Sequence, residues 1–382
     1  MNIIADENIP FVEQAFSAFG EVKTLPGRTM QNSDLLECEC LLVRSVTKVD
    51  QSLLEGSKIK FVASATIGTD HIDLEYLNTQ NIGFANAPGC NAESAAEYMI
   101  NALFNLSTRC NFDPFKLTAG VIGYGNVGSR VKKKLDALGI NTLINDPPLE
   151  ESGYDDVNFV SIQSIIDECD FITCHVPLTS DGDHPTQHLF DEARLRDLSD
   201  NTILFNASRG AVVDNSALSN LLNQRKDLTV FLDCWEGEPS INQTLLAQVD
   251  LATPHIAGYS YEGKLRGTQM ILAAACDFFE TKSDWHMQDH LPEKQSIQMD
   301  QGASKDFWQN LFTQHYDVDQ DYKRLLSLAT LSPQQLAVEF DLLRKLYPMR
   351  YEYNHFRFNL EQIPHDLAPI LELLQFEITH SS

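Results

Sequence analysis

The sequence has little positive charge. Lysine and arginine together number 28 against 54 aspartates and glutamates, which gives a formal net charge of −26 at pH 7. Such a chain repels polyanions, so the composition argues against nucleic acid and against an anionic membrane as partners. A small anionic substrate would need a local group of cations. Arg44, Arg209 and Arg350 lie in loop-like contexts where they could form one.

Long apolar runs and paired cysteine motifs are also lacking. No apolar run approaches the roughly 20 residues that cross a bilayer, and the first residues lack the basic start of a signal peptide. The eight cysteines include no Cys-x-x-Cys pair, so neither a zinc site nor a disulfide framework is indicated. We therefore expect free and largely buried thiols, no metal, and a reducing cytoplasmic location.

Short apolar runs alternate with helical stretches near the start of the chain. The runs that read as strands are Asn2–Ala5, Leu41–Val43, Phe61–Ala63 and Ile82–Ala85. Amphipathic segments at 10–19 and 72–80 lie between them, and this alternation predicts a parallel, doubly wound sheet. An alanine-rich helix is expected over 91–106, where Ser94 and Glu97 have the spacing of a capping box.

A second series of strands and helices follows. Its expected strands are Thr118–Ile122, Thr142–Asn145, Phe171–Val176, Thr202–Asn206 and Thr229–Leu232, with a helix over Val127–Leu138. Beyond about residue 285 the glycine motifs stop, and two helices are expected, at 333–346 and 366–376. The predicted fold class is α/β, with two doubly wound, Rossmann-like domains and a C-terminal α+β domain. The predicted domains are 1–92 plus 259–284 (substrate-binding), 93–258 (nucleotide-binding) and 285–382 (C-terminal).

The segment Gly123-Tyr-Gly-Asn-Val-Gly128 is a dinucleotide-binding fingerprint in the right context, because a strand precedes it and a helix follows it. We expect Gly123 to permit the tight turn, Gly125 to allow close approach of the pyrophosphate, and Gly128 to allow contact between helix and strand. The backbone N–H groups at the helix start, Asn126 and Val127, would hold the phosphates.

Asp146 ends the next strand and would accept hydrogen bonds from the adenosine ribose hydroxyls. A carboxylate there repels the 2′-phosphate of NADP, and the following Pro147-Pro148 offers no compensating arginine. NAD is therefore the predicted cofactor. A simple turn carboxylate is the alternative for Asp146.

Arg209, Glu238 and His255 are the candidate catalytic residues. Arg209 follows an apolar strand, and its planar fork suits a substrate carboxylate, although a structural ion pair is the alternative. His255 can exchange a proton with a substrate hydroxyl, and Glu238 can orient its ring. A buried core histidine is the alternative for His255. Asp233 ends a strand and either touches the nicotinamide or caps a turn.

Several ordered segments resemble the D-isomer-specific 2-hydroxyacid dehydrogenases over roughly residues 1–280. The matching segments are Ala65–Asp73, Asn86–Gly89, Gly120–Gly128, His175–Leu178, Asn206–Asp214, Asp233–Pro239 and Pro254–Gly258. Within the family the chain is most similar to the group that oxidises 4-phospho-D-erythronate in pyridoxal 5′-phosphate synthesis. The features that favour this group within the family are Val43–Thr47, His255–Tyr261 and the C-terminal extension with Tyr347–Arg350.

The resemblance implies NAD-dependent hydride transfer from the substrate's C2, with Arg209, Glu238 and His255 as catalytic residues. It implies that the C-terminal extension forms a homodimer. The implied substrate contacts are Ser45, Thr66 and Tyr259. The implied cofactor contacts are Asp146, His175, Ala207, Ser208, Asp233 and Gly258.

The substrate's terminal phosphate needs a second cationic site, and our hypothesis assigns it to Arg44 and Arg350, with Arg350 reaching across a dimer interface. An ordinary surface salt bridge is the alternative for Arg350. The polar stretch Thr179–Leu189 is longer than is usual in the wider family, and no role is assigned to it. Two other functions remain open: a dehydrogenase for another D-2-hydroxy acid such as 3-phosphoglycerate, and a non-catalytic NAD-sensing scaffold.

Overall fold

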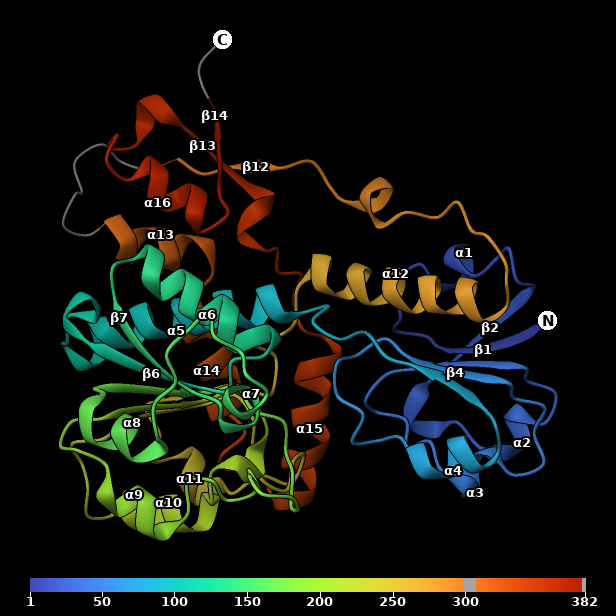
Figure 1. The fold of residues 1–382 in the computed structure, drawn as a ribbon, viewed down its shortest axis with the longest axis horizontal. Coiled ribbons are helices and arrows are strands. Elements are labelled where there is room, and N and C mark those ends of the chain that lie inside the picture. The colour runs from blue at the N-terminus through green and yellow to red at the C-terminus, as the bar shows by residue number, and fades with distance from the viewer. Residues whose placement is uncertain (299–306, 380–382) are drawn as a thin grey trace. The chain divides into compact units, whose positions relative to one another are not determined.

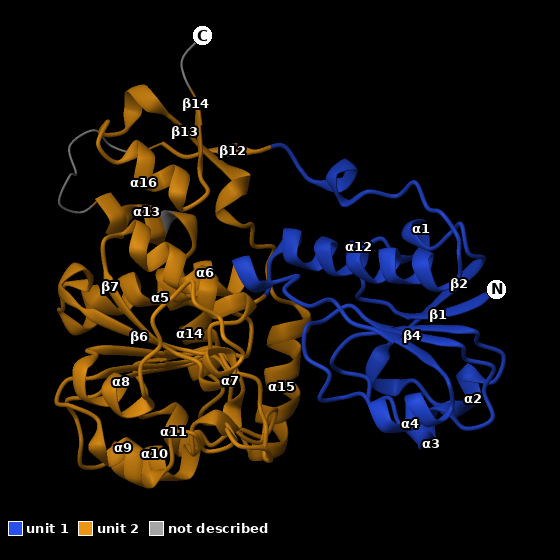
Figure 2. Ribbon diagram, in the orientation of Figure 1, with its two compact units in different colours: residues 1–93, 259–293 blue, residues 94–258, 294–382 orange. Residues whose placement is uncertain are grey.

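The computed structural model describes residues 1–298 and 307–379, and the chain forms two compact units. Unit 1 comprises Met1–Glu93 and Tyr259–Glu293, and unit 2 comprises Ser94–Gly258 and Lys294–Ser382 (Figure 2). The chain thus leaves unit 1, builds most of unit 2, returns to unit 1 and then enters unit 2 again. The C-terminal residues pack with unit 2, and their division into a third domain stays a prediction.

Unit 1 is built on a five-stranded parallel sheet with the order β2-β1-β3-β4-β5. The strands are β1 (Asn2–Asp6), β2 (Glu21–Leu25), β3 (Cys40–Val43), β4 (Phe61–Ser64) and β5 (Gly83–Ala85). The helices are α1 (Val12–Ala15), α2 (Asn32–Leu35), α3 (Gln51–Leu54), α4 (Leu74–Thr79) and α12 (Tyr261–Phe278), with short 3-10 turns η1 (Gly27–Thr29) and η4 (Met287–His290).

Both faces of this sheet are covered, because successive side chains of each buried strand point to opposite faces and both sets are apolar. Ile3 and Ala5 pack in the cluster that includes α1 and α12, whereas Ile4 packs with α2, α3 and α4 (Figure 1). The predicted doubly wound sheet is confirmed. The edge strand β2 was not predicted, because its half-exposed sequence Glu-Val-Lys-Thr-Leu lacks an apolar run.

Unit 2 contains a six-stranded parallel sheet with the order β11-β10-β9-β8-β6-β7. Its strands are β6 (Thr118–Ile122), β7 (Asn141–Asn145), β8 (Phe171–Cys174), β9 (Ile203–Asn206), β10 (Thr229–Leu232) and β11 (Leu251–Ala252). The chain runs from β6 to β7 on one side and then to β8 on the other. The carboxyl ends of β6 and β8 therefore mark the topological switch point, where open α/β sheets bind ligands.

The helix predicted over Val127–Leu138 corresponds to α6 (Asn126–Ala137). The other helices that follow these strands were not predicted: α7 (Pro147–Glu151), α8 (Ile162–Glu168), α9 (Glu192–Asp197), α10 (Asn215–Leu221) and α11 (Gln243–Leu246). The 3-10 turn η2 (Pro114–Lys116) precedes β6, and η3 (Gly210–Val212) follows β9. The α/β class and the Rossmann-like topology are confirmed.

The long helix expected over 91–106 is α5 (Ala92–Cys110). Its start makes the predicted capping box wrong, because Ser94 lies inside the first turn and not before it. Ser94 and Glu97 are both buried, and the Ser94 hydroxyl donates to the carbonyl oxygen of Ala257 at 3.3 Å. Both side chains thus serve contacts inside the protein, where buried polar groups need partners.

The C-terminal part of unit 2 adds a three-stranded parallel sheet and four helices among the described residues. Its elements are β12 (Gln295–Ser296), α13 (Phe307–His315), α14 (Val318–Leu326), α15 (Pro333–Lys345), η5 (Tyr353–His355), β13 (Phe356–Asn359), η6 (Leu360–Gln362), α16 (Ala368–Leu373) and β14 (Glu377–Thr379). The two predicted helices correspond to α15 and α16, and α13 and α14 were not predicted.

This C-terminal part is not a detached appendage. Leu325 of α14 and Phe340 of α15 are fully buried in the apolar cluster that also contains Leu245 and Val249. It therefore shares a core with the nucleotide-binding sheet. None of the described helices combines the length and the apolar character that a membrane span needs.

Candidate active site

The glycine-rich turn joins β6 to α6 and has the backbone that the fingerprint predicts. Gly123 has a φ of 88°, in the left-handed region that favours glycine. A Cβ on Gly128 would lie 1.8 Å from the Gly123 carbonyl oxygen, so only glycine permits that contact. A Cβ on Gly125 would meet nothing within 4 Å. The turn therefore leaves space at Gly125, next to the N–H groups of Asn126 and Val127, and this space fits a pyrophosphate.

The Asp146 carboxylate closes the other side of this turn. One oxygen accepts from the Tyr124 N–H at 2.7 Å, and the other accepts from the Leu149 N–H at 3.1 Å and caps α7. Asp146 is thus held at the end of β7, beside the glycine turn. It has the turn role that was the alternative, and the same placement fits a contact with the adenosine ribose.

His175 lies at the end of β8, across the switch point. Its Nε2 lies 2.9 Å from the Thr173 hydroxyl, whereas its buried Nδ1 has no hydrogen-bond partner. Burial lowers the pKa of His175 to about 3, so the ring is neutral at physiological pH. A buried nitrogen without a partner at this edge fits a hydrogen bond to a bound cofactor.

His255 and Glu238 form the hydrogen-bonded pair that the sequence predicts. The His255 Nδ1 and the Glu238 Oε1 lie 2.5 Å apart, and both side chains are about a quarter exposed. Burial alone would raise the pKa of Glu238, but the charge and hydrogen bond of His255 and the charge of Arg344 lower it overall. An ionised Glu238 accepts the Nδ1 proton, and it leaves Nε2 facing away from the acid for exchange with a substrate.

The backbone around His255 is held by Asp233, which follows β10. One Asp233 oxygen accepts from the Thr253 hydroxyl at 2.6 Å and from the Ile256 N–H at 2.7 Å, and the other accepts from the Ala257 N–H at 3.0 Å. These three donors match the capping alternative for Asp233. The bonds hold His255 at a φ of 55°, a left-handed conformation that is costly for a residue with a side chain.

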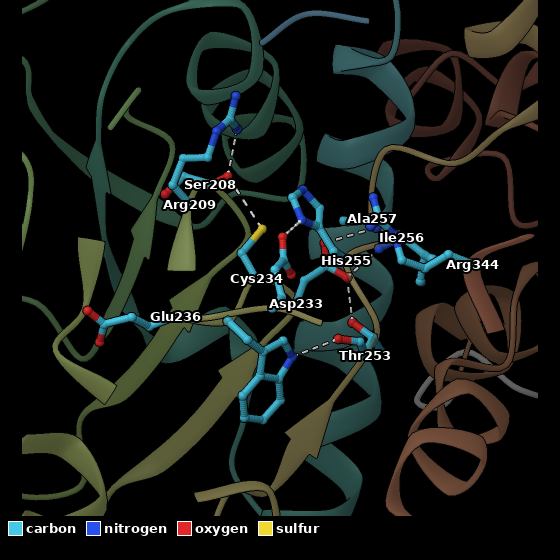
Figure 3. Close-up of polar contacts among 12 residues, drawn as sticks. Ser208, Arg209, Asp233, Cys234, Glu236, Thr253, His255, Ile256, Ala257 and Arg344 are labelled. Atoms are coloured by element: carbon cyan, nitrogen blue, oxygen red, sulfur yellow. Dashed lines mark hydrogen bonds and ion pairs between the residues drawn. The ribbon is translucent and has the colours of Figure 1, made fainter. Parts of the chain in front are cut away.

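Arg209 lies directly after β9, the strand next to β10. Its Nη1 donates to the Ser208 carbonyl oxygen at 2.8 Å, and the same oxygen accepts from the Cys234 thiol at 3.4 Å. A Cβ on Gly210 would lie 1.9 Å from the Trp235 carbonyl carbon, so these two loops are in tight contact. Figure 3 shows Arg209 and His255 on either side of the Asp233–Cys234 loop. The structure thus brings all three predicted catalytic residues to adjacent strand ends of unit 2.

The remaining predicted cofactor residues lie on the same loops. Ala207 follows β9 and is half-buried, and the Ser208 hydroxyl donates to the Asn206 side-chain oxygen at 2.9 Å. Gly258 is half-buried and ends the first segment of unit 2.

The predicted substrate residues other than Arg350 lie in unit 1. Arg44 and Ser45 follow β3, and Thr66 follows the neighbouring strand β4, so their positions lie at one edge of the sheet. Arg44 is half-buried, and within the described residues its side chain has no hydrogen bond or ion pair. Tyr259 is half-buried, and the Lys264 ammonium lies 5.1 Å from its ring centre.

Arg350 requires a correction, because its placement does not suit a phosphate ligand. The side chain is 6% exposed, inside unit 2. Its Nη2 donates to the Ser94 hydroxyl at 2.7 Å, to the Ile256 carbonyl oxygen at 3.3 Å and to the Ala257 carbonyl oxygen. The guanidinium is therefore occupied by this protein's own oxygens, and the surface salt bridge that was the alternative does not apply either.

Two features of the site have no counterpart in the sequence interpretation. The first is Arg344 of α15, labelled in Figure 3, whose charge helps to lower the pKa of Glu238 although the two residues lie far apart in sequence. The second concerns the polar stretch 179–189: His188 Nε2 lies 2.8 Å from the Glu236 carboxylate and ties the stretch to the loop after β10. Within the described chain, His188, Asp214 and Glu236 are close enough together to hold a metal ion, but no further observation points to one.

Comparison with known proteins places this geometry in a family. Residues 97–257 match the family described as "D-isomer specific 2-hydroxyacid dehydrogenase, NAD binding domain". Erythronate-4-phosphate dehydrogenase of Pseudomonas syringae pv. syringae is 43% identical over 98% of this chain and 99% of its own length. The protein of that name from Proteus mirabilis is 41% identical over the full length of both chains.

Solved structures show the same architecture. NAD+-bound 3-phosphoglycerate dehydrogenase of Entamoeba histolytica has a TM-score of 0.63 at 25% identity and covers 73% of this chain and 95% of its own. D-lactate dehydrogenase of Aquifex aeolicus, solved with NAD and lactic acid, has a TM-score of 0.60 at 25% identity and covers 73% and 96%. Each leaves about a quarter of this chain unmatched. NAD is the cofactor.

Gly125 and Gly128, the second and third glycines of the fingerprint, should respond differently to an added methyl group. Gly125→Ala should keep the melting temperature of the apoprotein, because nothing contacts the added Cβ, but should weaken NAD binding about tenfold or more by crowding the phosphates. Gly128→Ala should lower the melting temperature of the apoprotein, because its Cβ meets the Gly123 carbonyl oxygen. Calorimetric titration and thermal melts check both. Unchanged NAD affinity in Gly125→Ala would contradict the assignment of the turn.

Proposed function

We propose that this chain, which belongs to the erythronate-4-phosphate dehydrogenases of the D-isomer specific 2-hydroxyacid dehydrogenase family, oxidises 4-phospho-D-erythronate to (R)-3-hydroxy-2-oxo-4-phosphooxybutanoate. It is an NAD-dependent dehydrogenase, and bound NAD supplies the acceptor for the hydride that leaves C2 of the substrate. The name of the relatives implies a place in pyridoxal 5′-phosphate synthesis. The hydrogen-bonded pair of His255 and Glu238 is the observation on which the proposal depends.

His255 is the proposed proton carrier. With Nδ1 bonded to Glu238, its Nε2 takes the C2 hydroxyl proton as the C–H bond breaks, and it returns a proton in the reverse reaction. The positive charge that forms on the ring is stabilised by the Glu238 carboxylate. The strained left-handed backbone of His255 supports this role, because such strain is typical of functional sites.

Arg209 is proposed to bind the substrate carboxylate and the C2 oxygen. Its guanidinium carries donors in a planar fork that matches a carboxylate, and it follows β9, which β10 separates from β11, the strand before His255. As C2 becomes a carbonyl carbon, the fixed positive charge also polarises the C–O bond. Asp146, His175 and the glycine turn are proposed to hold NAD along the ends of β7, β8 and β6.

Replacing Glu238 should damage catalysis without damaging cofactor binding. Glu238→Gln keeps the shape of the side chain but removes the charge that stabilises the imidazolium, so kcat should fall about 10²-fold or more. The dissociation constant for NAD should stay unchanged. Glu236→Gln is the matched control, since Glu236 bonds His188 and not His255. A Glu238→Gln enzyme with wild-type kcat would exclude the pair as the acid–base apparatus.

Arg44 is the proposed phosphate ligand, now without Arg350. It is a half-buried cation at the carboxyl end of β3, and its side chain has no partner among the residues described. Such a cation suits a phosphate dianion, because the excess of acidic residues leaves few other positive groups to hold one. Ser45, Thr66 and Tyr259 are proposed to contact the rest of the substrate.

Substrate choice can be tested by NADH formation, followed as absorbance at 340 nm, with 4-phosphoerythronate, 3-phosphoglycerate and erythronate. The wild-type kcat/KM should be highest for 4-phosphoerythronate and higher with NAD than with NADP. Arg44→Ala should raise the KM for 4-phosphoerythronate about tenfold to a hundredfold with little change in kcat. Lys48→Ala, an exposed cation nearby, is the control. If 3-phosphoglycerate is preferred, the proposed substrate is wrong, and if Arg44→Ala leaves KM unchanged, Arg44 is not the ligand.

A homodimer through the C-terminal part is proposed on the basis of an exposed apolar stripe. Val338 and Leu342 on α15 and Leu346 at its C-terminal cap are spaced four residues apart, with exposed fractions of 67%, 39% and 69%, and Met349 follows at 64%. Residues at this spacing share one helix face. Adjacent exposed apolar residues of this size mark protein interfaces, and a second copy of the chain is the proposed occupant.

The dimer can be tested by light scattering after size-exclusion chromatography. The wild type should have twice the 43.0 kDa chain mass, and a Val338→Asp/Leu346→Asp variant should shift to 43.0 kDa, because buried charge opposes association. Leu36→Asp, at a 44% exposed leucine of unit 1, is the control and should stay dimeric. A wild-type chain that elutes as a monomer would refute the dimer.

A cytoplasmic location is proposed because the eight cysteines form no disulfide among the described residues and six of them are buried. Burial raises the pKa of Cys38 to about 11 and that of Cys174 to about 12, so these thiols stay protonated and unreactive. Recovery of the native enzyme in an oxidised periplasmic fraction would contradict this location.

A further inference from the structure

The peptide groups of residues 255–257 are bonded on two sides by opposite charges. We propose that Arg350, in the C-terminal part of the chain, is a positioning residue for His255: its guanidinium and the Asp233 carboxylate together clamp the backbone that carries the imidazole. This inference rests on the proposed function of His255, because it explains how the proton carrier is held.

The N–H side of the clamp belongs to Asp233. Its two oxygens receive the N–H groups of Ile256 and Ala257 at 2.7 and 3.0 Å, and the side chain is 1% exposed. The His255 N–H donates to the Asp233 carbonyl oxygen at 2.8 Å. Three consecutive N–H groups are therefore bonded to a single residue.

The C=O side of the clamp belongs to Arg350. Its Nη2 donates to the carbonyl oxygens of Ile256 and Ala257, the same two residues whose N–H groups bond Asp233. The Ser94 hydroxyl bridges Arg350 and Ala257: it accepts a hydrogen bond from the guanidinium at 2.7 Å and donates one to the Ala257 carbonyl oxygen at 3.3 Å. Charge-assisted hydrogen bonds are stronger than neutral ones, so the two charges polarise and hold these peptide groups.

A buried guanidinium is stable only where its charge is compensated. The Arg350 carbon Cζ lies 4.6 Å from the ring centre of Tyr98 and 5.3 Å from that of Tyr316, which are cation–π distances. Asp321 adds a buried carboxyl group that accepts hydrogen bonds from Tyr98, Tyr316 and Tyr347. The surroundings thus stabilise Arg350 in one position, from which it reaches the loop.

The segment that carries Arg350 is itself anchored to the nucleotide-binding part of unit 2. The Tyr353 N–H donates to the Glu97 carboxylate at 3.0 Å, and the Tyr353 ring lies 5.0 Å from the Lys134 ammonium of α6. Lys134 is 2% exposed and also lies 3.6 Å from the Glu97 carboxylate. Arg350 therefore cannot withdraw from the 255–257 loop without breaking these buried contacts.

The clamp has a specific consequence for the acid–base pair. His255 has a left-handed backbone that its side chain disfavours, and the bonds on both sides of the peptide groups offset this strain. Without the guanidinium, the carbonyl oxygens of Ile256 and Ala257 lose their charged donor and the loop gains other conformations. The imidazole would then leave the position that a proton transfer requires, where a displacement of about 1 Å can cost about 10²-fold in rate.

The experiment compares Arg350→Met, Arg350→Lys and the control Arg357→Met, an exposed arginine of β13 that bonds the Ser296 hydroxyl. Arg350→Met should lower kcat about 10²-fold while NADH affinity and KM stay within about twofold. The primary isotope effect on kcat with C2-deuterated substrate should rise, because hydride transfer becomes more rate-limiting. Arg350→Lys should recover part of kcat, since it keeps the charge but not the fork.

Hydrogen exchange of the folded proteins gives a readout that does not depend on activity. The Ile256 and Ala257 amides should exchange about tenfold faster or more in Arg350→Met, whereas the amides of β6 and β8 keep wild-type rates. Wild-type exchange at 256–257 together with a wild-type isotope effect would overturn the proposal, even if kcat falls. A raised KM with unchanged kcat would instead make Arg350 a substrate contact and would also overturn it.

A milder variant covers the case in which Arg350→Met does not fold. Ser94→Ala removes only the bridging hydroxyl, and it should produce the same changes in exchange and isotope effect at smaller size. Wild-type values in Ser94→Ala would then overturn the clamp. Failure of the proposed function is a separate result, because a wild type that forms no NADH from 4-phosphoerythronate can still show faster amide exchange in Arg350→Met.

Discussion

The imidazole of His255, the proposed proton carrier, is carried by a short peptide segment held between a buried carboxylate and a buried guanidinium. Asp233 bonds the N–H groups of Ile256 and Ala257, and Arg350 bonds their carbonyl oxygens. His255 precedes these residues in a left-handed conformation, so its ring direction is set by a strained backbone and not by side-chain packing alone. Glu238 then fixes the ring itself through Nδ1.

The parallel sheet of unit 2 explains why these groups come together. In such a sheet every strand ends at the same edge, and the loops after β6, β7, β8, β9 and β10 carry the glycine turn, Asp146, His175, Arg209 and Asp233. The order of strands places β6 beside β8, where the winding of the sheet reverses, and open α/β sheets bind ligands at such a point. The order of the parallel strands therefore brings together functional side chains from distant parts of the chain, although few of these side chains contact one another.

The C-terminal part of unit 2 has a buried side that packs in the core and an exposed apolar side. Its inner side joins the core of unit 2 through Leu325 and Phe340, and it delivers Arg344 and Arg350 toward the Glu238–His255 pair. The outer side of α15 exposes Val338 and Leu342, and the exposed Leu346 caps its C-terminal end. The helix proposed as a dimerisation surface is thus followed directly by the segment whose Arg350 bonds the loop after His255.

Much of the fold could be predicted, because buried parallel strands are continuous apolar runs and glycine turns have strict backbone requirements. The strands β1, β3, β4 and β5 and those from β6 to β10 were predicted from their apolar runs. The sequence interpretation failed where local pattern is weak. The edge strand β2 is half-exposed, and Ser94 has capping-box spacing but lies inside α5, where its hydroxyl bonds Ala257. The helices α13 and α14 were not predicted.

The residues of the candidate site likewise fall into those that the sequence predicted and those whose role only the structure shows. From the sequence alone came the nucleotide turn, the pair of Glu238 and His255, and Arg209 at a strand end, because each has a local signature tied to its neighbours along the chain. Only the tertiary structure decided that Asp233 holds a loop and that Arg350 is buried against carbonyl oxygens and not exposed to a phosphate. The physical reason is that a charge acquires its role from the dipoles that surround it after folding. For Arg350 those dipoles are the carbonyl groups of Ile256 and Ala257, which lie far away in sequence. The residues next to Arg350 in the chain therefore could not predict this contact.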